Sequence, residues 1–306
     1  MPRNTHVPAR PARTVVAVSV GGLLLSGCGS STTPGSDHSA SDLRNRLPGA
    51  IREAGVLRIA SYLNYPPVDF KGQDGEPAGI DPDLASALGS RLGLKVEFED
   101  MPFENVIPSV QAKKVDLGMS AVIDTKQRQD GIDDNGRPTT SGVDFIDYFV
   151  TGTSILVKNG NPLGISTLDN LCGHTIAVQR GTVQDEIAQR QVGACAKGDK
   201  TLQIDELKTD DQALAEVTAG TAVADLNDFP VAEYNTSQHS GRFLMAGGSL
   251  QSGPYGITVN KDSADLEYVL ARTLDQLIQN GQYDRILGKW SVTSGQVSSA
   301  VTNGGL

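Results

Sequence analysis

Residues 115–128, VDLGMSAVIDTKQR, combine a short, mostly apolar run with a charged residue at its end. The apolar run is typical of a buried strand, and Arg128 follows eight residues after Ser120. About a hundred residues later a second apolar run, 222–227, ends beside Asp228. Each run thus places one fixed charge at the carboxyl end of a strand. A cation and an anion held in this way suit a zwitterion and indicate a site for a free amino acid.

Strands and helices alternate on both sides of this segment. We expect strands at 57–61, 95–99, 115–120, 175–179 and 222–227, and helices at 82–92, 105–114, 182–191, 210–219, 264–280 and 283–290. Asp81 and Pro82 have the pattern of a helix cap followed by proline at the first helical position. This alternation indicates an α/β protein, with a mostly parallel sheet covered by helices.

The first 27 residues have the features of an export signal. They carry three arginines, no acidic residue and an apolar run, Val15 to Leu25, that is too short for a permanent membrane span. The sequence Leu25-Ser26-Gly27-Cys28 resembles a lipobox, and the alternative is an ordinary secretion signal followed by a chance cysteine. We expect residues 1–27 to be a lipoprotein signal peptide. Lipidated Cys28 would then start a flexible tether, 28–46, that holds the chain at the outer face of the cell membrane.

The charge of the mature chain excludes nucleic acid as a partner. The sequence has 26 basic and 36 acidic residues, and removal of the three arginines of the signal leaves 23 basic residues and a net charge of −13. Nucleic acid demands a basic surface. An acidic body instead fits a soluble domain that a tether holds beside an anionic membrane.

Two cysteines remain beyond the signal, Cys172 and Cys195, and in an exported chain an even number predicts a disulfide bond. A metal site is the weaker alternative, because only His174 lies near and the three side chains do not complete a zinc site. The polar segment 129–142 resembles a calcium loop. With Gly136 at the sixth position of such a loop, however, the first and twelfth positions fall on Gly131 and Gly142, which have no side-chain ligand. We interpret it as a solvated insertion, and we expect no metal and no cofactor.

Four loops at the carboxyl ends of the expected strands form the candidate site, because ligands bind there in open α/β sheets. Arg128 offers a guanidinium that grips a carboxylate through two parallel hydrogen bonds. The glycine turn before Thr182 opens a helix whose free N–H groups favour an anion. Asp228 suits an ammonium group, and Tyr65 and Phe103 offer aromatic walls.

Each of these residues also has a more ordinary interpretation. Arg128 fits a surface arginine paired with Asp130 or Asp133, Asp228 fits a helix N-cap, and the two aromatic residues fit a core. Their shared position at one edge of the sheets favours the functional interpretation.

Short segments over residues 47–292 form an ordered set of motifs. They are LRIAS (57–61), YPP (65–67), AGIDPDL (78–84), FENVIP (103–108), VDLGMS (115–120), TKQR (125–128), VDFIDYF (143–149), VQRGT (178–182), PYGI (254–257), NGQYDRI (280–286) and KW (289–290). This set resembles the family-3 extracellular solute-binding proteins, the polar amino-acid receptors of ABC importers. The resemblance implies a two-lobed periplasmic-binding-protein-like (type II) fold with two crossing hinge strands, near 149–153 and 252–256.

The resemblance also divides the chain. Lobe 1 would comprise residues 47–150 and 256–292, and lobe 2 residues 151–255. The Ser-, Gly- and Thr-rich residues 293–306 are expected to form a disordered tail.

The family's roles carry over to matching positions of this chain. Arg128 would bind the α-carboxylate with the backbone N–H groups of Ile123 and Val183. Asp228 would bind the α-ammonium group with the carbonyl of Ala121 and the side chain of Ser120. The full set of candidate ligand-binding residues is Tyr62, Tyr65, Phe103, Ser120, Ala121, Ile123, Arg128, Gln179, Arg180, Thr182, Val183 and Asp228.

The implied partners are a free amino acid with a polar or acidic side chain, the membrane subunits of an ABC permease and, through the lipid anchor, the membrane. The chain is expected to act as a monomer that closes its two lobes around the ligand. A ligand that touches Arg128 in one lobe and Asp228 in the other would stabilise the closed form.

The chain departs from the family pattern at three of these positions. Ile123 stands where Thr or Ser is usual, Val183 replaces Thr or Gly, and Tyr62 stands where receptors for basic amino acids and glutamine carry Asp. We therefore expect weak binding of arginine, lysine and histidine. Arg180 and Arg242 would favour an acidic side chain, unless both are merely solvated.

Two other functions occur on this fold. Cyclohexadienyl dehydratases need a positioned general acid in the cleft, and the four loops hold no carboxylate–histidine arrangement. A sensor module would feed a kinase or a channel, and we find no later membrane span in the sequence. We expect a binding protein and not an enzyme.

Overall fold

The computed structural model describes residues 39–133 and 135–305. The expected signal peptide and the lipidation site Cys28 lie outside these ranges. Within them, no helix has both the length and the apolar character that a membrane crossing needs.

The main sheet has nine strands in the order β5-β1-β6-β11-β7-β10-β8-β9, with β12 paired to β7, and a small sheet has the order β2-β3-β4. The strands are β1 (Val56–Ser61), β2 (Asn64–Tyr65), β3 (Asp69–Lys71), β4 (Pro77–Ala78), β5 (Lys95–Asp100), β6 (Leu117–Gly118), β7 (Asp144–Lys158), β8 (Thr175–Gln179), β9 (Gln203–Leu207), β10 (Ala224–Asp228), β11 (Phe243–Val259) and β12 (Val301–Thr302). Strand β1 is parallel to β5 and β6, and β8 is parallel to β9 and β10. This confirms the predicted α/β class with parallel strands.

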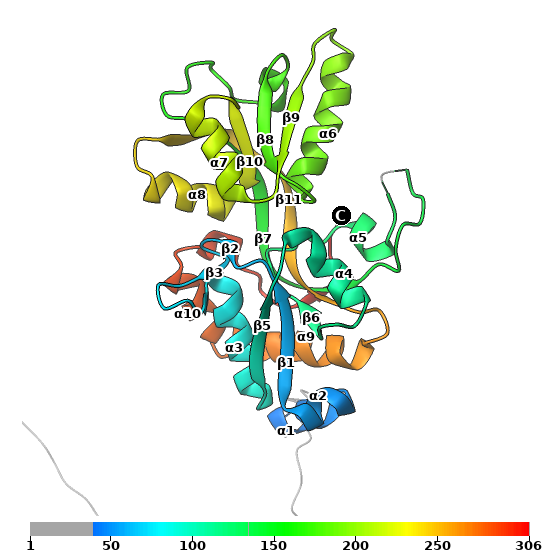
Figure 1. Ribbon diagram of the computed structural model, residues 1–306. Helices are drawn as coiled ribbons and strands as arrows, with labels where there is room; N and C mark the ends of the chain where they lie inside the picture. The colour runs from blue at the N-terminus through cyan, green and yellow to red at the C-terminus, as the bar shows by residue number, and fades with distance from the viewer. Residues whose placement is uncertain (1–38, 134, 306) are drawn as a thin grey trace, which may run out of the picture. The chain divides into compact units, whose positions relative to one another are not determined.

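Two long antiparallel strands, β7 and β11, run through both ends of the main sheet (Figure 1). At one end β11 pairs with β6, and at the other end β7 pairs with β10. Tyr255 lies opposite Phe149, and Ser252 lies opposite Gly152, so the two segments expected to cross between the lobes are paired with each other. The two-lobed fold is therefore confirmed. We call the part with β1, β5 and β6 the first lobe and the part with β8, β9 and β10 the second lobe; their residue boundaries stay predictions.

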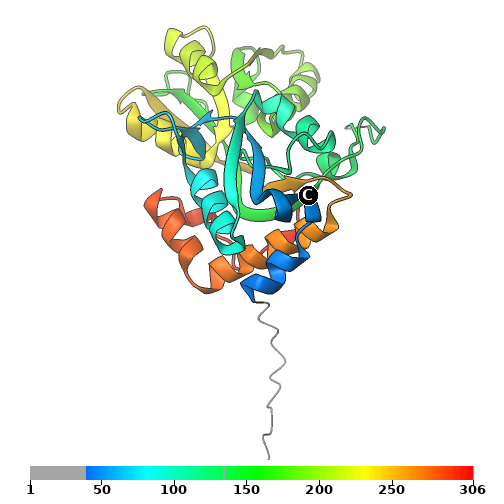
Figure 2. The same cartoon turned by 60° about the horizontal axis from the view of Figure 1, so that its bottom comes forward.

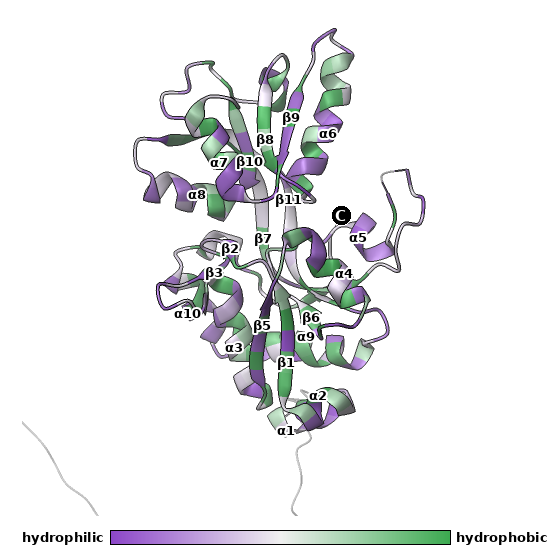
Figure 3. Cartoon of the chain, in the orientation of Figure 1, coloured by the Kyte–Doolittle hydropathy of each residue, from purple (hydrophilic) through white to green (hydrophobic). Residues whose placement is uncertain are grey.

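Helices cover both lobes. They are α1 (Ala40–Arg46), α2 (Gly49–Ala54), α3 (Ile80–Leu92), α4 (Val106–Gln111), α5 (Lys126–Asp130), α6 (Val183–Ala196), α7 (Asp210–Ala219), α8 (Phe229–Gln238), α9 (Ala264–Gln279) and α10 (Gln282–Lys289), with 3-10 turns η1 (Phe103–Asn105), η2 (Leu168–Leu171) and η3 (Thr293–Gly295). In α9 the expected apolar face is buried, including Leu266, Leu270 and Leu274. Figure 3 shows apolar and polar residues alternating along α3 and α9, as expected for helices with one buried face.

The start of α3 differs from the prediction. Gly79 occupies the N-cap position with φ 128°, and Asp81 lies inside the first turn and is fully buried. Asp81 is no cap, because its carboxylate accepts hydrogen bonds from the backbone N–H of Ala121 (3.0 Å) and from the Tyr148 hydroxyl (2.5 Å). The sequence has the pattern of a cap, but the Asp81 carboxylate accepts hydrogen bonds from residues distant in the chain.

Two predicted elements are shorter than expected. Only Leu117–Gly118 of the run 115–120 forms a strand, because the chain turns at Ala121, which has a left-handed backbone with φ 50°. Of the run 105–114, only Val106–Gln111 forms an α-helix, α4, and the 3-10 turn η1 precedes it.

The tether predicted for residues 28–46 is wrong at its end. Residues 40–46 form α1, whose N-cap Ser39 makes a capping box with Asp42. Leu43 is buried, and the Arg44 guanidinium donates to the carbonyl of Leu92 (2.6 Å). Figure 2 shows α1 lying against α9. Burial of one apolar face outweighs the polar composition of this segment.

The disordered tail predicted for residues 293–306 is also wrong over its described part, 293–305. Val301 and Thr302 form β12 on the edge of β7, opposite Asp147 and Ile146. The composition of this segment is polar and rich in small residues, but its backbone N–H groups find acceptors on the body, and small side chains allow a close approach.

The predicted disulfide is confirmed, since Cys172 and Cys195 are bonded, with Cα atoms 5.4 Å apart. It ties the end of η2 to α6. In the described part of segment 129–142, a bridge between Ile132 and Pro138 closes a polar turn. No group of three potential metal ligands gathers among residues 39–133 and 135–305.

Candidate functional site

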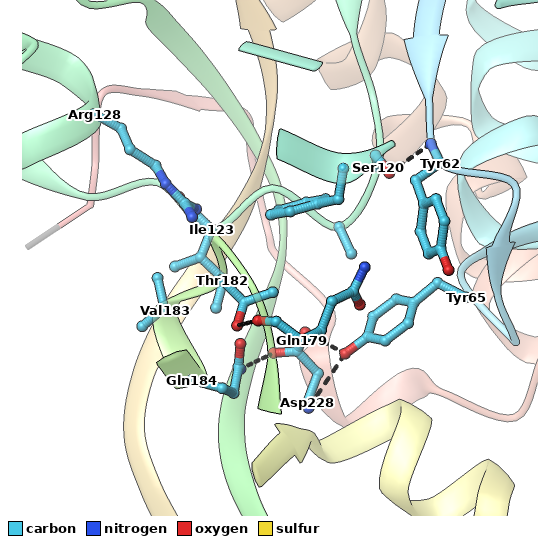
Figure 4. A pocket seen from close by; sticks show the side chains of 12 residues that line it. Tyr62, Tyr65, Ser120, Ile123, Arg128, Gln179, Thr182, Val183, Gln184 and Asp228 are labelled. Atoms are coloured by element: carbon cyan, nitrogen blue, oxygen red, sulfur yellow. Dashed lines mark hydrogen bonds between the residues drawn. The ribbon is translucent and has the colours of Figure 1, made fainter. Parts of the chain in front are cut away.

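Loops from both lobes line one enclosed cavity beside the crossing strands (Figure 4). The lining residues are Tyr62, Tyr65, Phe103, Ser120, Ala121, Ile123, Arg128, Gln179, Thr182, Val183, Gln184 and Asp228. Eleven of them belong to the predicted site. Of the twelve predicted residues, only Arg180 lies elsewhere, and none of the twelve lining residues is a histidine.

The cavity is tightly closed. The centre of a water-sized sphere can occupy about 10 Å³ of it, which is room for about one water molecule. An amino acid is larger than a water molecule. Its entry therefore requires the lining side chains or the two lobes to move apart.

Arg128 lies in α5 and reaches across the cavity between the lobes. Its Nη1 donates to the carbonyl of Ile123 (2.8 Å), and its Nη2 donates to the carbonyl of Gly181 (3.1 Å) in the second lobe. The guanidinium lies 5.9 Å from the centre of the Phe103 ring. Because a guanidinium has five N–H donors, three stay available for a ligand.

Arg128 is not the ordinary surface arginine of the alternative interpretation. Asp130 pairs with Lys126 and Asp133 pairs with Arg137, so neither aspartate neutralises it. Among the described residues, none of the ion pairs includes Arg128. Burial lowers the pKa of its guanidinium, and the nearby carboxylates of Glu186 and Asp228 oppose that shift. A half-buried cation without a carboxylate partner is suited to an anionic ligand group.

Two backbone N–H groups face the cavity near Arg128. The residues on both sides of Ile123 form backbone hydrogen bonds with β11. The N–H of Asp124 donates to the carbonyl of Pro254 (2.8 Å), and the N–H of Gly256 donates to the carbonyl of Val122 (2.9 Å). This pairing leaves the Ile123 N–H turned away from β11, and it donates to no described residue. Ile123 has no side-chain hydroxyl, so its backbone N–H group is the donor that it offers here.

The second backbone donor is at the start of α6. Thr182 is the N-cap, and its side chain accepts from Asp185 N (3.1 Å) and donates to the Gln179 carbonyl (2.7 Å). Val183 is the first helical residue, and its N–H group donates to no described residue. This helix end and Arg128 together form a cradle for an anion.

Asp228 ends β10 and is 4% exposed. It occupies the N-cap position of α8, but its side chain makes no cap hydrogen bond. Its carboxylate instead accepts from the Tyr65 hydroxyl (2.9 Å) and from the Gln184 amide (2.9 Å). Burial raises the pKa of Asp228 to about 6, although hydrogen bonds and Arg128 oppose the shift. The alternative of a simple helix cap is therefore wrong.

Tyr65 does more than form an apolar wall. Its hydroxyl, from the first lobe, shares its proton between Asp228 and the Asn227 side-chain oxygen (2.7 Å) in the second lobe. Gln184 also contacts the hydroxyl of Thr153 on β7 (3.1 Å). These bonds hold the Asp228 carboxylate in one orientation.

The turn at Ser120 and Ala121 is fixed by two buried carboxylates. The Ser120 hydroxyl donates to Asp69 (2.6 Å) and accepts from Tyr62 N (3.0 Å), which leaves one lone pair for a ligand donor. Asp81 holds the left-handed Ala121 through its N–H group. Burial raises the pKa of Asp81 to about 7 and that of Asp69 well above its ordinary value.

Gln179 and Tyr62 line the remaining side of the cavity. Gln179 is 6% exposed, and its amide nitrogen has no hydrogen-bond partner in the described part of the chain. Figure 4 shows this amide pointing into the space beside Tyr65. Burial raises the pKa of Tyr62 to about 12, and the carboxylates of Asp211 and Asp210 add to the shift. This end of the cavity therefore combines one free amide nitrogen with a negative electrostatic potential.

Arg180 points away from this site. Its side chain is half exposed and pairs with Glu206 (3.5 Å) on the outer strand β9. Arg180 therefore does not line the cavity in this structure, and its predicted contact with a ligand stays a prediction.

The sequence interpretation missed three residues that shape the site, Asp69, Asp81 and Gln184. Gln184 follows Thr182 by two residues in the first turn of α6, so tracing that helix turn would have found it. Asp69 and Asp81 gave no such signal, because each reaches the site through the core.

Comparisons with known proteins agree on one family for this chain. The arginine-binding protein ArgT of Corynebacterium glutamicum is 27% identical over 98% of both chains. A solved mutant of the arginine-binding protein of T. maritima superposes with a TM-score of 0.68 at 28% identity, over 79% of this chain and 97% of that chain. The ancestral amino acid-binding protein AncCDT-1, a precursor of cyclohexadienyl dehydratase, has a TM-score of 0.69 at 30% identity, over 79% and 97%.

The relatives among curated proteins are named as binding proteins, which agrees with the expectation that the chain is not an enzyme. One family model matches residues 57–293, which is more than half of the chain. The chain belongs to the family that this model describes, the bacterial extracellular solute-binding proteins of family 3.

Proposed function

We propose that this chain is the extracytoplasmic substrate-binding lipoprotein of an ABC importer and that it binds a free α-amino acid in the cavity of Figure 4. One observation carries the proposal. An arginine without an acidic partner and a buried carboxylate, Arg128 and Asp228, line the same enclosed cavity from different lobes.

The ligand's two charged ends determine its placement. The α-carboxylate lies against the free N–H donors of Arg128 and the backbone N–H groups of Ile123 and Val183. The α-ammonium group lies against Asp228, with the Ala121 carbonyl and the free lone pair of Ser120 as further acceptors. Each lobe supplies part of each half-site, so that binding favours the closed form.

The ligand's side chain faces Gln179, Tyr62 and the aromatic rings. We infer a neutral polar side chain, because the unpartnered Gln179 amide is a buried donor that gains a hydrogen bond from a ligand oxygen. An acidic side chain is disfavoured by Asp210 and Asp211 behind Tyr62. Arg180, one of the two arginines that favoured an acidic ligand, pairs with Glu206 outside the cavity.

Several relatives are named for binding arginine, lysine or histidine. By the resemblance described above, Tyr62 stands here where receptors for these amino acids carry Asp. We keep the prediction that arginine, lysine and histidine bind weakly. Lipidation of Cys28 would tether the monomer to the outer face of the membrane and raise its effective concentration beside the permease subunits.

A thermal-shift panel of the twenty amino acids tests this function. We expect a neutral polar amino acid to raise Tm most. The α-amide and the N-acetyl form of that amino acid, each lacking one charged end, should give no shift. A chain that responds to no amino acid, or equally to the α-amide, contradicts the proposal.

A further inference from the structure

We propose that the C-terminal strap, residues 293–305, is a positioning element of the ligand site. It holds the loop that carries Ile123 and Arg128, which we call the ligand loop. The inference rests on the proposed function for its meaning in binding, but the contact between strap and loop is measurable without a ligand. The family match ends at residue 293, so family resemblance gives no information on nearly all of the strap.

The strap is bonded along its length to the first lobe. The Tyr283 hydroxyl donates to the Tyr148 carbonyl (2.8 Å) and accepts from Val297 N (3.0 Å). Ala300 N donates to Asp275 on α9 (2.8 Å). Strand β12 then extends the edge of β7. Among the described residues, the hydrogen bonds of the strap go to the first lobe and its hinge strand, so the strap acts on that lobe.

Asn303 anchors the last part of the strap. Its side-chain oxygen accepts from Phe145 N (2.9 Å), and its side-chain nitrogen donates to Asp144 (3.0 Å). Its own N–H group donates to the Phe145 carbonyl (3.1 Å). This anchor delivers the next two residues to the ligand loop.

Two glycine N–H groups then reach buried carboxylates. Gly304 N donates to Asp147 (3.1 Å), and Gly305 N donates to Asp124 (2.8 Å). Asp124 is 1% exposed, and its other oxygen accepts from the Gln129 amide (2.8 Å). Burial raises the pKa of Asp124 and that of Asp147, and the glycine N–H groups stabilise the charged forms.

These bonds lie behind the first-lobe side of the anion cradle. Asp124 follows Ile123, and Gln129 follows Arg128, so Asp124 connects the two ends of the ligand loop through one side chain. The strap completes the hydrogen bonding of that side chain. Loss of the strap would leave one oxygen of a buried carboxylate without its donor and loosen the loop.

The sequence of the strap fits this close approach. A Cβ on Gly305 would overlap the Asp124 carbonyl, and a Cβ on Gly304 would meet the Asp147 carboxylate. A Cβ on Gly295 would overlap the Phe149 ring on the crossing strand. All three glycines stand where any side chain would push the strap off the body. By contrast, nothing lies within 4 Å of a Cβ on Gly288, an exposed glycine in α10.

The test compares Gly305→Ala with the matched control Gly288→Ala in the full chain. Hydrogen exchange is followed in peptides covering 120–130 and, as an internal reference, α7 of the second lobe. We expect Gly305→Ala to speed exchange at 120–130 about tenfold while leaving α7 unchanged. Affinity for the amino acid that gives the largest thermal shift should fall about tenfold. Gly288→Ala should change neither quantity.

A second variant, Asn303→Ala, removes the anchor without adding an atom and serves if Gly305→Ala does not fold. Unchanged exchange at 120–130 in the folded strap variants overturns the inference, as does unchanged affinity when the wild type binds. If the wild type binds no amino acid, the proposed function fails, while the exchange experiment still decides whether the strap holds the loop.

Discussion

The Tyr65 hydroxyl of the first lobe donates a 2.9 Å hydrogen bond to the Asp228 carboxylate of the second lobe. This bond lowers the pKa of Asp228 against the dominant effect of burial, which raises it to about 6. An ammonium group binds the ionised carboxylate, so the charge state of Asp228 controls the ammonium half of the site.

Affinity for the ligand should therefore decrease as the pH falls through about 6, because protonation removes the charge that faces the ammonium group. Tyr65→Phe keeps the aromatic wall but removes the bond, so it should move this midpoint to higher pH. Calorimetry between pH 5 and 8 measures both profiles. Tyr62→Phe is the control, and identical midpoints for Tyr65→Phe and wild type would refute this role.

Gln179→Leu should change ligand preference. The substitution keeps the volume and removes the free amide, so affinity for a polar amino acid should fall about tenfold, the loss expected for one hydrogen bond. Binding of alanine, whose side chain cannot reach the amide, should be nearly unchanged. Equal losses for both amino acids in calorimetry would show that Gln179 has no part in selectivity.

The free energy of unfolding should fall as the pH rises from about 4 to 7. Burial raises the pKa values of Asp81, Asp147 and Asp210 to about 7 each, whereas unfolded aspartates titrate near 3.9. In this window the folded chain holds protons that the unfolded chain has released, so deprotonation costs stability. Tm should be several degrees higher at pH 5.5 than at pH 8.

Asp147→Asn checks the origin of this effect, since it removes one of the raised carboxyls. The Tm difference between pH 5.5 and pH 8 should shrink in this variant. A wild-type Tm that is equal or higher at pH 8 would mean that these carboxyls do not dominate.

Replacing both Cys172 and Cys195 by alanine should destabilise the chain by about 3 kcal/mol, because the disulfide closes a loop with a sequence separation of 23. For a chain of this size, that loss lowers Tm by about 6–12 °C in a thermal melt. A reductant should lower the Tm of the wild type similarly and leave the double variant unaffected. A shift below about 2 °C would show that the second lobe does not depend on the bond.

Regular periodicity made the fold predictable from the sequence. The face of α9 that carries Leu266, Leu270 and Leu274 repeats at helical spacing, and these leucines are buried as expected. The positions of Arg128 and Asp228 were predictable for a related reason, because each follows an apolar strand.

The failures occur where tertiary contacts decide the structure. Asp81 has the local pattern of a cap, yet its carboxylate is used forty residues away at Ala121. The strap has the composition of a disordered tail, yet Gly304 and Gly305 donate to buried aspartates. Such contacts leave no periodic signal, since each depends on a partner distant in the sequence.

Calorimetry of Arg128→Ala with the best-binding amino acid at pH 7.5 tests the central claim most directly. Arg180→Ala, which alters a surface ion pair outside the cavity, is the matched control. Loss of a buried charge pair costs about 2–5 kcal/mol, so Arg128→Ala should weaken binding at least thirtyfold while Arg180→Ala stays near wild type. Wild-type affinity in a folded Arg128→Ala variant would contradict the account.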